Sequence, residues 1–247
     1  MGQLESVYIE GIDDIDNDSI LHGDLTVERI AKIIKDGDVK NIVVMSGAGI
    51  SVAAGIPDFR TPGTGLYYNL EKFNLPTPES MFDIEYFREH PESFYSFVMV
   101  SLRLRSHAQE LFPEQYMPTY THYFIKLLNN KGLLLRDYTQ NIDGLERQAG
   151  IPDSRLVESH GTMATCSCIQ CKRPQKIEWF KKQIMSRIIP RCKCGGLVKP
   201  DIVFFNEPLP QKFNWMSTAD MASCDLLIVM GTSLAVQPFA SESRRGV

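Results

Sequence analysis

The sequence predicts an α/β fold, with a doubly wound, mostly parallel sheet and a smaller domain that is helical and rich in cysteine. Short apolar runs that end in glycine or polar residues alternate along the chain with stretches of helical periodicity. A segment rich in Pro, Tyr and Phe interrupts this alternation at residues 61–120, and five of the six cysteines fall between Cys166 and Cys194. The alternation predicts the sheet, and the two interruptions predict the smaller domain.

Composition and charge limit the classes of function. The chain has 247 residues, a length that suits one large domain or a domain with an inserted module. Apolar residues make up 43 % and charged residues 23 %, which is ordinary for a globular protein. The net charge of −4 gives no overall positive field, so we expect no direct sequence-specific nucleic-acid binding. No apolar run reaches ~18 residues. No basic and apolar leader opens the chain. We therefore expect neither a transmembrane segment nor a secretory signal.

The N-terminal residues carry one lipidation pattern. Residues 1–24 are acidic and lack periodicity, which predicts a flexible acidic arm. The start matches M-G-x-x-x-S from Gly2 to Ser6, the pattern of N-myristoylation, although so short a pattern also arises by chance. No basic cluster follows to supply a second anchor, so membrane association through a lipid on Gly2 would be weak.

The first elements of the sheet lead into a glycine-rich loop. Residues 25–35 have helical spacing, with Thr26 available as the N-cap. The run NIVVMS at residues 41–46 is continuously apolar and β-branched, which predicts a buried parallel strand. The segment GAGISVAAGIPDFR follows at once. Gly47 and Gly49 fit the G-x-G-x-x-G turn of dinucleotide-binding proteins, but Val52 stands where the third glycine belongs.

The later elements continue the alternation. Residues 61–120 predict an insertion with helices at 84–89 and 93–112, and residues 121–130 predict a helix that stops at Gly132. The runs LLLRDYTQN, RLVESHG, DIVFFNE and CDLLIVMGTS predict the remaining strands of the parallel sheet, with Cys224 as a core residue. A ligand of such a sheet binds beyond the carboxyl ends of the strands, where Gln140, His160 and Gly231 follow.

The clustered cysteines predict a metal site. Cys168-x-x-Cys171 is followed after 20 residues by Cys192-x-Cys194, and two such pairs can close a tetrahedral thiolate site of the zinc-ribbon kind. The second pair is one residue shorter than usual, and Cys166 could replace one of the four ligands. Four thiolates leave no open coordination position, so we expect one structural Zn²⁺ and no catalytic metal.

Several motifs now occur in one order: GAGIS, GIPDFR, TQNIDGLE, ESHGT, the cysteine ribbon, KPDIVFFNE and VMGTS. Together they resemble the sirtuin family of NAD-dependent protein lysine deacylases over about residues 25–240, and most of all its class I branch, which includes cytosolic members. The resemblance implies a discontinuous Rossmann-like NAD-binding domain at residues 25–60, 121–163 and 198–240. It also implies a helical module at 61–120, a zinc-ribbon module at 164–197 and a divergent tail at 241–247.

The resemblance also implies roles for individual residues. His160 is the general base, Asn141 orients the ribose and a water, and Asp143 binds the nicotinamide amide. Val203 and Phe204 line the channel for the acyl-lysine substrate. The residues that contact NAD, besides Asn141 and Asp143, are Gly47, Ala48, Gly49, Ser51, Asp58, Phe59, Arg60, Gln140, Ile142, Gly231, Thr232 and Ser233.

Within this set, the glycine-rich loop has the most specific implied role. Gly47 and Gly49 let backbone N–H groups approach the phosphates, and Ser51 begins the next helix. Asp58, Phe59 and Arg60 form a mobile lid, with Phe59 covering the reaction centre.

The resemblance implies a reaction in which NAD is consumed. The acyl-lysine carbonyl oxygen attacks C1′ of the nicotinamide ribose and nicotinamide leaves. His160 then deprotonates a ribose hydroxyl, which attacks the O-alkylamidate carbon. Water completes the transfer, so that O-acyl-ADP-ribose and free lysine are released. Such proton transfer contributes roughly 10²–10⁴-fold to the rate. Acetyl is the default acyl group, acetylated proteins are the expected partners, and we expect the protein in the cytoplasm, with the nucleus as a second location.

Three features depart from the family pattern. The segment VMVSLRLRSH within residues 97–107 adds about ten residues, which predicts a longer helix or loop. Asn206 stands where the family usually has glycine, and it could crowd a bound peptide. The family continues past VQPFA with a further strand, whereas this chain turns to SESRRGV, so we expect a truncated C-terminus, an exposed edge strand and weakened NAD affinity.

Two other classes of function compete with this interpretation. One is a catalytically weakened acyl-lysine binding module that lacks the C-terminal part of the NAD site. The other is an NAD-dependent dehydrogenase, which explains the glycine-rich loop but not the cysteine ribbon. Mono-ADP-ribosyl transfer is a variation within the sirtuin interpretation.

Overall fold

A computed structural model describes residues 26–58, 61, 63, 65–66, 70, 73–103 and 116–242. The chain divides into two compact units, residues 1–40 and 41–247. In the first unit, helix α1 (Val27–Asp36) begins where Thr26 Oγ1 accepts a hydrogen bond from the Arg29 N–H, and it ends at Gly37, whose φ is 82°. The predicted helix and its N-cap are thus confirmed. The predicted arm at residues 1–24 and the lipidation pattern at Gly2 lie outside the described residues.

The larger unit is built on a parallel sheet. Its four strands, within the described part of the chain, are β1 (Ile42–Ser46), β2 (Leu134–Thr139), β3 (Leu156–Glu158) and β7 (Leu226–Met230), in the order β3-β2-β1-β7. All neighbouring strands run parallel. The chain moves from β1 toward β3 on one side and returns to β7 on the other. The strand order therefore reverses between β1 and β7, where α/β sheets of this kind bind ligands.

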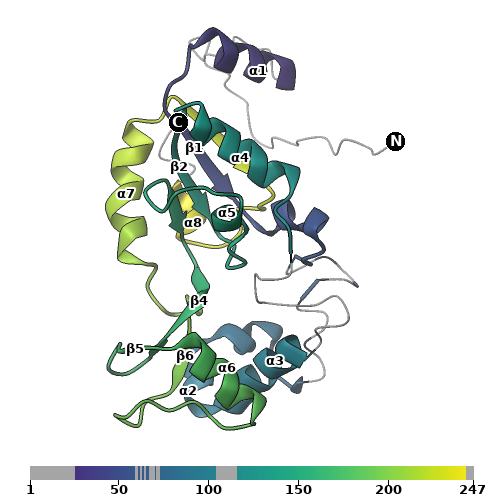
Figure 1. The fold of residues 1–247 in the computed structure, drawn as a ribbon, viewed down its shortest axis with the longest axis vertical. Helices are drawn as coiled ribbons and strands as arrows, with labels where there is room; N and C mark the ends of the chain where they lie inside the picture. The colour runs from purple at the N-terminus through teal and green to yellow at the C-terminus, as the bar shows by residue number, and fades with distance from the viewer. Residues whose placement is uncertain are drawn as a thin grey trace. The chain divides into compact units, whose positions relative to one another are not determined.

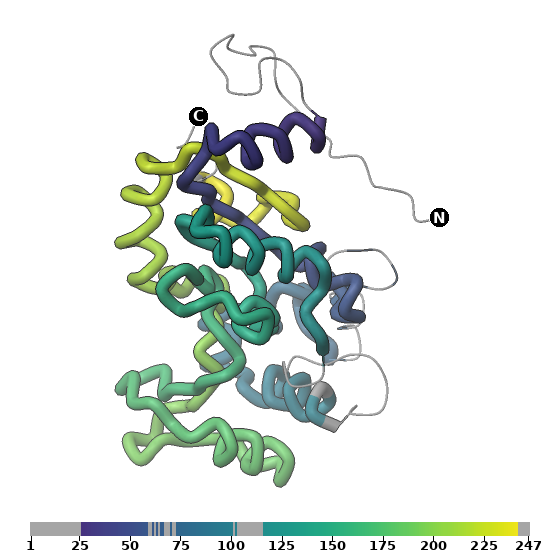
Figure 2. The backbone as a smooth tube through the Cα atoms, turned by 45° about the horizontal axis from the view of Figure 1, so that its top comes forward, coloured from purple at the N-terminus to yellow at the C-terminus, as the bar shows by residue number. Residues whose placement is uncertain are grey.

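Helices cover both faces of this sheet, which confirms the doubly wound α/β class. Helix α4 (Tyr120–Asn130) packs on β2 and on α5 (Leu145–Gln148). Helix α7 (Gln211–Ala222) lies on the opposite side (Figures 1 and 2). The alternation of side chains along β1 accounts for this arrangement, because it presents one set of residues to each face. One core cluster joins the sheet to α7 and to α8 (Phe239–Glu242), and it contains Val43, Met45, Tyr138, Val157, Phe213, Met221 and Phe239.

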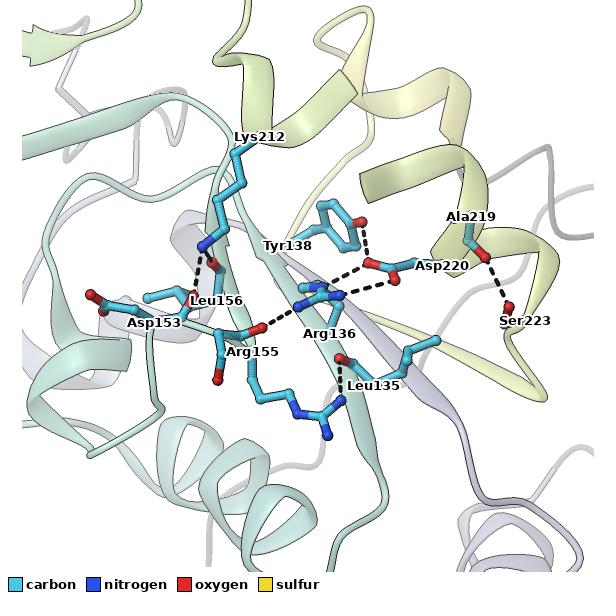
Figure 3. Close-up of polar contacts among 11 residues, drawn as sticks. Leu135, Arg136, Tyr138, Asp153, Arg155, Leu156, Lys212, Ala219, Asp220 and Ser223 are labelled. Atoms are coloured by element: carbon cyan, nitrogen blue, oxygen red, sulfur yellow. Dashed lines mark hydrogen bonds and ion pairs between the residues drawn. The ribbon is translucent and has the colours of Figure 1, made fainter. Parts of the chain in front are cut away.

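Polar contacts fix α7 against the sheet (Figure 3). Arg136 on β2 donates to both carboxylate oxygens of Asp220 on α7, at 2.7 and 3.1 Å, and the Tyr138 hydroxyl donates to the same carboxylate at 2.6 Å. Lys212, at the other end of α7, donates to the carbonyls of Asp153 and Leu156. These bonds supply partners for the polar groups of a face that is otherwise apolar.

A second, antiparallel sheet holds the cysteines. Its strands are β4 (Gly161–Cys168), β5 (Pro174–Gln175) and β6 (Val198–Ile202), in the order β5-β4-β6, with helix α6 (Ile177–Met185) beside them. The prediction that DIVFFNE is a strand of the parallel sheet is wrong, because residues 198–202 pair with β4. The reason is that β4 leaves the parallel sheet directly after His160. When the chain returns as β6, it therefore pairs with β4.

The helical insertion shares a core with this second sheet. The short helix η3 (Pro78–Phe82), α2 (Ile84–Glu89) and α3 (Pro91–Arg103) lie beside β4 to β6 and α6 (Figure 1). Edge-to-face aromatic pairs link Phe87 and Phe94 to Phe204, and Tyr95 to Phe180 on α6. The helix predicted at 93–112 is described as far as Arg103, and the remainder of the added segment lies outside the described residues. Across the described part of the chain, no helix has the length and apolar character to span a membrane.

Candidate active site

A cavity of about 730 Å³ opens at the point where the strand order reverses. This volume lies within the range of ~300–1,000 Å³ that is typical of small-molecule sites. Of the predicted NAD-contacting residues, those that line the cavity are Ala48, Gly49, Asp58, Gln140, Asn141, Ile142, Gly231, Thr232 and Ser233. Gly47, Ser51 and Asp143 are not among the lining residues, and Phe59 and Arg60 lie outside the described part of the chain.

The glycine-rich loop is shaped by the loop after β7. The Gly47 N–H donates to the Met230 carbonyl at 3.1 Å, and the Gly49 N–H donates to the Gly231 carbonyl at 2.8 Å. A Cβ on Gly49 would lie 2.7 Å from the Gly231 Cα, and one on Gly231 would lie 2.5 Å from the Ile50 nitrogen. Both N–H groups thus bond to backbone carbonyls of the chain itself, and their expected role at a phosphate stays a prediction. The glycines are needed because two loops touch here through their backbones.

Ser51 anchors a buried polar chain behind the cavity wall. It lies within the 3₁₀ helix η1 (Ala48–Ala54), not at the start of a helix as predicted, and its hydroxyl donates to Asp143 Oδ2 at 2.7 Å. Asn141 Nδ2 donates to Ser51 Oγ and to the Gly47 carbonyl, both at 3.2 Å. Asp143 Oδ1 accepts from the Leu145 N–H at 3.0 Å and so caps α5. Asp143 thus reaches the cavity through Ser51 and Asn141.

Gln140 joins the two loops at the floor of the cavity. Its Oε1 accepts a 2.6 Å hydrogen bond from the Thr232 hydroxyl. Its backbone N–H donates to the Ser46 carbonyl at 2.9 Å. Its Nε2 is buried and has no hydrogen-bond partner within the described residues. A buried, unpaired amide donor at a cavity wall suits a ligand with acceptor oxygens.

The two ring nitrogens of His160 differ, because only Nδ1 is bonded to the protein backbone. Its Nδ1 lies 3.1 Å from the Gln140 carbonyl oxygen, which can only accept, so Nδ1 carries the proton and Nε2 has the free lone pair. Burial lowers the pKa of His160, while the bond to Gln140 opposes the shift. The side chain lines the cavity. The structure therefore presents a neutral imidazole whose basic nitrogen is Nε2, as a general base requires.

Gly161 follows His160 and is held tightly. Gly161 begins β4 and is buried. Its φ is +76°, and a Cβ there would lie 2.0 Å from the Asp201 carbonyl oxygen. The crossing of β4 and β6 thus requires glycine, and the Val203 N–H bonded to the His160 carbonyl at 2.8 Å holds the histidine backbone.

Asp58 closes a turn at the mouth of the cavity. Its carboxylate accepts hydrogen bonds from the Thr61 N–H at 2.8 Å and from the Thr61 hydroxyl at 2.5 Å. Both residues line the cavity. Of the lid predicted at Asp58, Phe59 and Arg60, only Asp58 lies within the described residues.

The apolar end of the cavity is formed by the chain after β6. Val203 and Phe204, which the sequence predicted at an acyl-lysine channel, both line this cavity, although Phe204 is 1 % exposed and belongs mainly to the aromatic core. Phe82 and Phe205 also line it, and the sequence analysis did not single them out. The Phe205 N–H donates to the Phe82 carbonyl at 2.7 Å, a contact between distant segments that no local pattern signals.

Asn206 adopts the left-handed backbone that its glycine-like position demands. Its φ is +68°. Its amide Nδ2 donates to Asp83 Oδ2 at 2.6 Å, and Asp83 also caps α2 by accepting from the Glu85 and Tyr86 N–H groups. The side chain lines the cavity but is tied to the helical module. This bond directs the extra atoms toward Asp83 and so limits the crowding that the sequence led us to expect.

The four predicted cysteine ligands come together. The sulfurs of Cys168 and Cys194 lie 3.5 Å apart, those of Cys171 and Cys192 lie 3.7 Å apart, and all four lie within 4.8 Å of one another. Four thiolates around one Zn²⁺ at ~2.3 Å would have sulfur–sulfur distances of about 3.8 Å. The arrangement therefore fits a tetrahedral zinc site.

Cys166 is not part of this cluster. It faces the hydrophobic core, its thiol donates to the Gln175 carbonyl at 3.5 Å, and burial raises its pKa to about 12. A thiol with so high a pKa is a poor thiolate ligand. Cys224 packs against the core of the parallel sheet, as predicted.

The fold and the cavity define an α/β protein with a cavity at a topological switch point and a separate cluster of four cysteines whose geometry fits a zinc ion. Comparison with known proteins gives the family. Residues 47–238 match the sequence model of the Sir2 family. The chain therefore belongs to the Sir2 family, as the resemblance in the sequence implied.

Individual relatives agree with this assignment. The chain is 51 % identical over 98 % of its length to the "NAD-dependent protein deacetylase sirtuin-2" of Danio rerio, and covers 62 % of that protein. It is 54 % identical over 87 % of its length to the "NAD-dependent deacetylase sir2A" of Dictyostelium discoideum, and covers 41 % of it. It is 51 % identical over 87 % of its length to the "NAD-dependent protein deacetylase hst2" of Schizosaccharomyces pombe. The chain thus spans about 41 to 62 % of the length of these relatives.

Proposed function

We propose that the protein is an NAD-dependent protein lysine deacetylase that cleaves NAD to nicotinamide, transfers the acyl group to ADP-ribose and frees the lysine. The observation that carries this proposal is the neutral His160, which lines the cavity at the strand-order reversal and whose Nδ1 is bonded to the Gln140 carbonyl, so that Nε2 keeps its lone pair. The names of the relatives support the same activity. The weakened binding module gains no support from these findings, since the cavity retains His160 and Asn141.

The cavity wall fits NAD. The backbones of Gly49 and Gly231 pack against each other in the cavity wall, and Gln140, which also lines the cavity, has an unpaired buried amide donor among the described residues. When bound, NAD would supply the reactive ribose carbon and its nicotinamide leaving group. Asn141, held by Ser51 and Gly47, would orient the ribose, and His160 Nε2 would accept a proton from a ribose hydroxyl. Ile142, Thr232 and Ser233 would complete the contacts from the same two loops.

The apolar end of the cavity suits an acylated lysine. Val203, Phe204, Phe82 and Phe205 present apolar surface there. A charged lysine would lose its hydration on entering, whereas a neutral acyl-lysine would lose far less. We therefore propose acetylated proteins as the substrates.

The cysteine cluster would hold one structural Zn²⁺ through Cys168, Cys171, Cys192 and Cys194. With all four coordination positions taken by sulfur, the ion would have no open position for a substrate. It would act by fixing the hairpins of the second sheet, on which β6 and the chain to Val203 depend.

The domain boundaries and the location remain predictions. The pairing of β6 with β4 supports moving residues 198–202 from the NAD-binding domain to the zinc-ribbon module. The other boundaries are kept as predicted. We propose the cytoplasm as the main location and the nucleus as a second one.

The proposal is tested by nicotinamide release from the purified 247-residue chain with NAD and an acetyl-lysine peptide. We expect release that requires the peptide, together with O-acetyl-ADP-ribose detected by mass. His160→Ala should lower the rate by roughly 10²–10⁴-fold without loss of folding, because it removes the base alone. His90→Ala, at a half-exposed histidine outside the cavity, is the matched control and should retain the rate. Absence of release from a folded, zinc-loaded sample would contradict the proposal.

The dependence of kcat/KM on pH provides a second test of His160 as the general base. Its folded pKa is lowered below the ordinary value of ~6.5 because the ring is buried. The neutral, active form therefore persists below pH 6.5, and kcat/KM should fall only as the pH drops through the lowered pKa. A fall that begins well above pH 6.5 would show that another group is the base.

A further inference from the structure

A buried cluster of three titratable groups lies behind the cavity wall. His122 on α4 and Glu146 on α5 are both 0 % exposed, and Asp143 is 9 % exposed. One nitrogen of His122 and one carboxylate oxygen from each acid all lie within 4.8 Å of one another. Two carboxyl groups this close and this buried cannot both remain ionised at low cost, so the location of the proton matters.

Hydrogen bonds place the negative charge on Asp143. Its two oxygens accept from the Leu145 N–H at 3.0 Å and from the Ser51 hydroxyl at 2.7 Å. Neither carboxylate oxygen of Glu146 has a hydrogen-bond partner among the described residues. Donors stabilise the ionised form of an acid, whereas burial without donors stabilises the neutral form. Asp143 is therefore the anion, and Glu146 holds the proton.

The surroundings of Glu146 act in the same direction. Burial raises the pKa of Glu146 well above its ordinary value, and the charges of Asp143 and of Asp137 on β2 raise it further. The Thr139 side chain and the Glu146 backbone oppose this shift, but neither forms a hydrogen bond with the Glu146 carboxyl by distance and angle, so the opposition is weak. His122, the basic residue of the cluster, is neutral, because burial lowers its pKa.

The tautomer of His122 follows from its capping contact. The Thr119 backbone N–H, which can only donate, bonds to His122 Nδ1 at 3.1 Å. Nδ1 therefore accepts, and the proton lies on Nε2, which is buried without a partner in the described chain. The same three groups resemble a cation site, but a protonated Nε2 and a protonated Glu146 would leave Asp143 as the only anionic ligand. A hydrogen-bonding cluster accounts for these groups better than a metal site does.

The charge on Asp143 has a consequence at the cavity. Because Asp143 accepts the Ser51 proton, Ser51 Oγ can only accept from Asn141, and it does so from Nδ2 at 3.2 Å. The Gly47 carbonyl takes the other Nδ2 proton. Both contacts hold the amide nitrogen of Asn141 against the protein. The amide oxygen Oδ1 is therefore the atom that can face the cavity, which Asn141 lines. A neutral Asp143 would free Ser51 to donate to Asn141 and would allow the amide to turn over.

We propose that Glu146, held in its protonated form, and His122 are positioning residues. They leave Asp143 as the one ionised carboxyl of the cluster. Through Ser51, Asp143 then fixes the direction in which the Asn141 amide faces the cavity. The effect on turnover rests on the proposed deacetylase function. The location of the proton does not depend on that function.

The first test measures the proton directly. Carbon-13 NMR of the purified chain, labelled at Glu and Asp carboxyl carbons, is followed with pH, and the Glu146 signal is assigned by its loss in Glu146→Gln. We expect Glu146 to remain protonated at pH 7 and Asp143 to remain ionised. The signal of the exposed Glu178 serves as the internal reference for the labelled carboxyl carbons. An ionised Glu146 at pH 7 would overturn the inference, whether or not the chain turns over NAD.

The second test uses turnover by matched variants. Glu146→Gln keeps a neutral group of the same size, so kcat should remain within about threefold of the wild-type chain. Glu146→Ala removes the group, and Ser51→Ala breaks the link to Asn141. Each should lower kcat by about tenfold or more, with a smaller change in KM for NAD, because orientation at the reacting centre affects kcat first. Glu178→Gln is the control for a lost surface charge.

The outcomes separate the two proposals. A loss in Glu146→Gln equal to that in Glu146→Ala would mean that an ionised carboxylate is needed, and would overturn the inference. An unchanged kcat in Ser51→Ala would also overturn it. Absence of turnover in the wild-type chain, with Glu146 protonated by NMR, would contradict the proposed function and leave the proton location established.

Discussion

The cysteine cluster and the cavity are assembled in different ways. The four sulfurs of the cluster come from residues 168–194, on strands and turns of one small antiparallel sheet. The cavity walls come from segments spread between Ala48 and Pro238, which include the loops after β1, β2 and β7 and the chain after β6. The cluster is a product of local spacing, whereas the cavity is a product of topology.

This difference determines what holds each site together. The cluster needs only the spacing of two short pairs of cysteines to bring four sulfurs together, and we propose that ligand bonds to a zinc ion hold it. The cavity depends on close backbone contact, such as that between Gly49 and Gly231, and on hydrogen bonds across the switch point. Loss of a ligand should therefore affect one module wholly, and a change in the cavity should have a smaller and more graded effect.

The largest expected effect comes from removing one cysteine ligand. Cys171→Ser should abolish stoichiometric zinc binding and remove stabilisation of order 10 kcal/mol from the second sheet, because structural zinc and folding are coupled. Zinc content and thermal unfolding measure the effect. Cys166→Ala, which removes a sulfur outside the cluster, should keep one zinc per chain. Full zinc content in Cys171→Ser would show that the cluster is not the metal site.

A smaller effect is expected at the contact between the two loops. Gly231→Ala should cost about 3 kcal/mol in the free energy of unfolding, since it adds strain at a left-handed position to a clash with the Ile50 nitrogen. It should also weaken NAD binding. Gly132→Ala is the matched control, because its φ is +73° but a Cβ there meets nothing within 4 Å. We expect about 1 kcal/mol for the control. Chemical denaturation measures both variants. Equal losses in the free energy of unfolding would show that the close approach of the two loops does not require glycine at position 231.

The smallest effect is expected at Asn206. Asn206→Gly loses the hydrogen bond to Asp83 but relieves the left-handed backbone, so the two changes should nearly cancel, within about 1 kcal/mol. We expect KM for an acetyl-lysine peptide to change by no more than about threefold. A tenfold or larger fall in KM would mean that Asn206 does crowd the substrate, as the sequence first suggested.

The sequence was sufficient for the parts that rest on local pattern. The apolar run at 42–46, the helix after Thr26 and the spacing of the four cysteines predicted β1, α1 and the cluster correctly. Periodicity and ligand spacing act over a few residues, so they can be read without the fold. The order of the motifs, from GAGIS to VMGTS, was also enough to indicate the family.

Only the tertiary structure decided which segments meet. It placed β6 in the antiparallel sheet, gave Gly49 a backbone partner in Gly231, and set Phe82 beside Phe205. It also put Asp143 behind Ser51 and beside Glu146, where burial and the supply of donors decide which acid is charged. These properties depend on distances between residues far apart in the chain, and such distances are fixed by strand order and packing, not by local sequence.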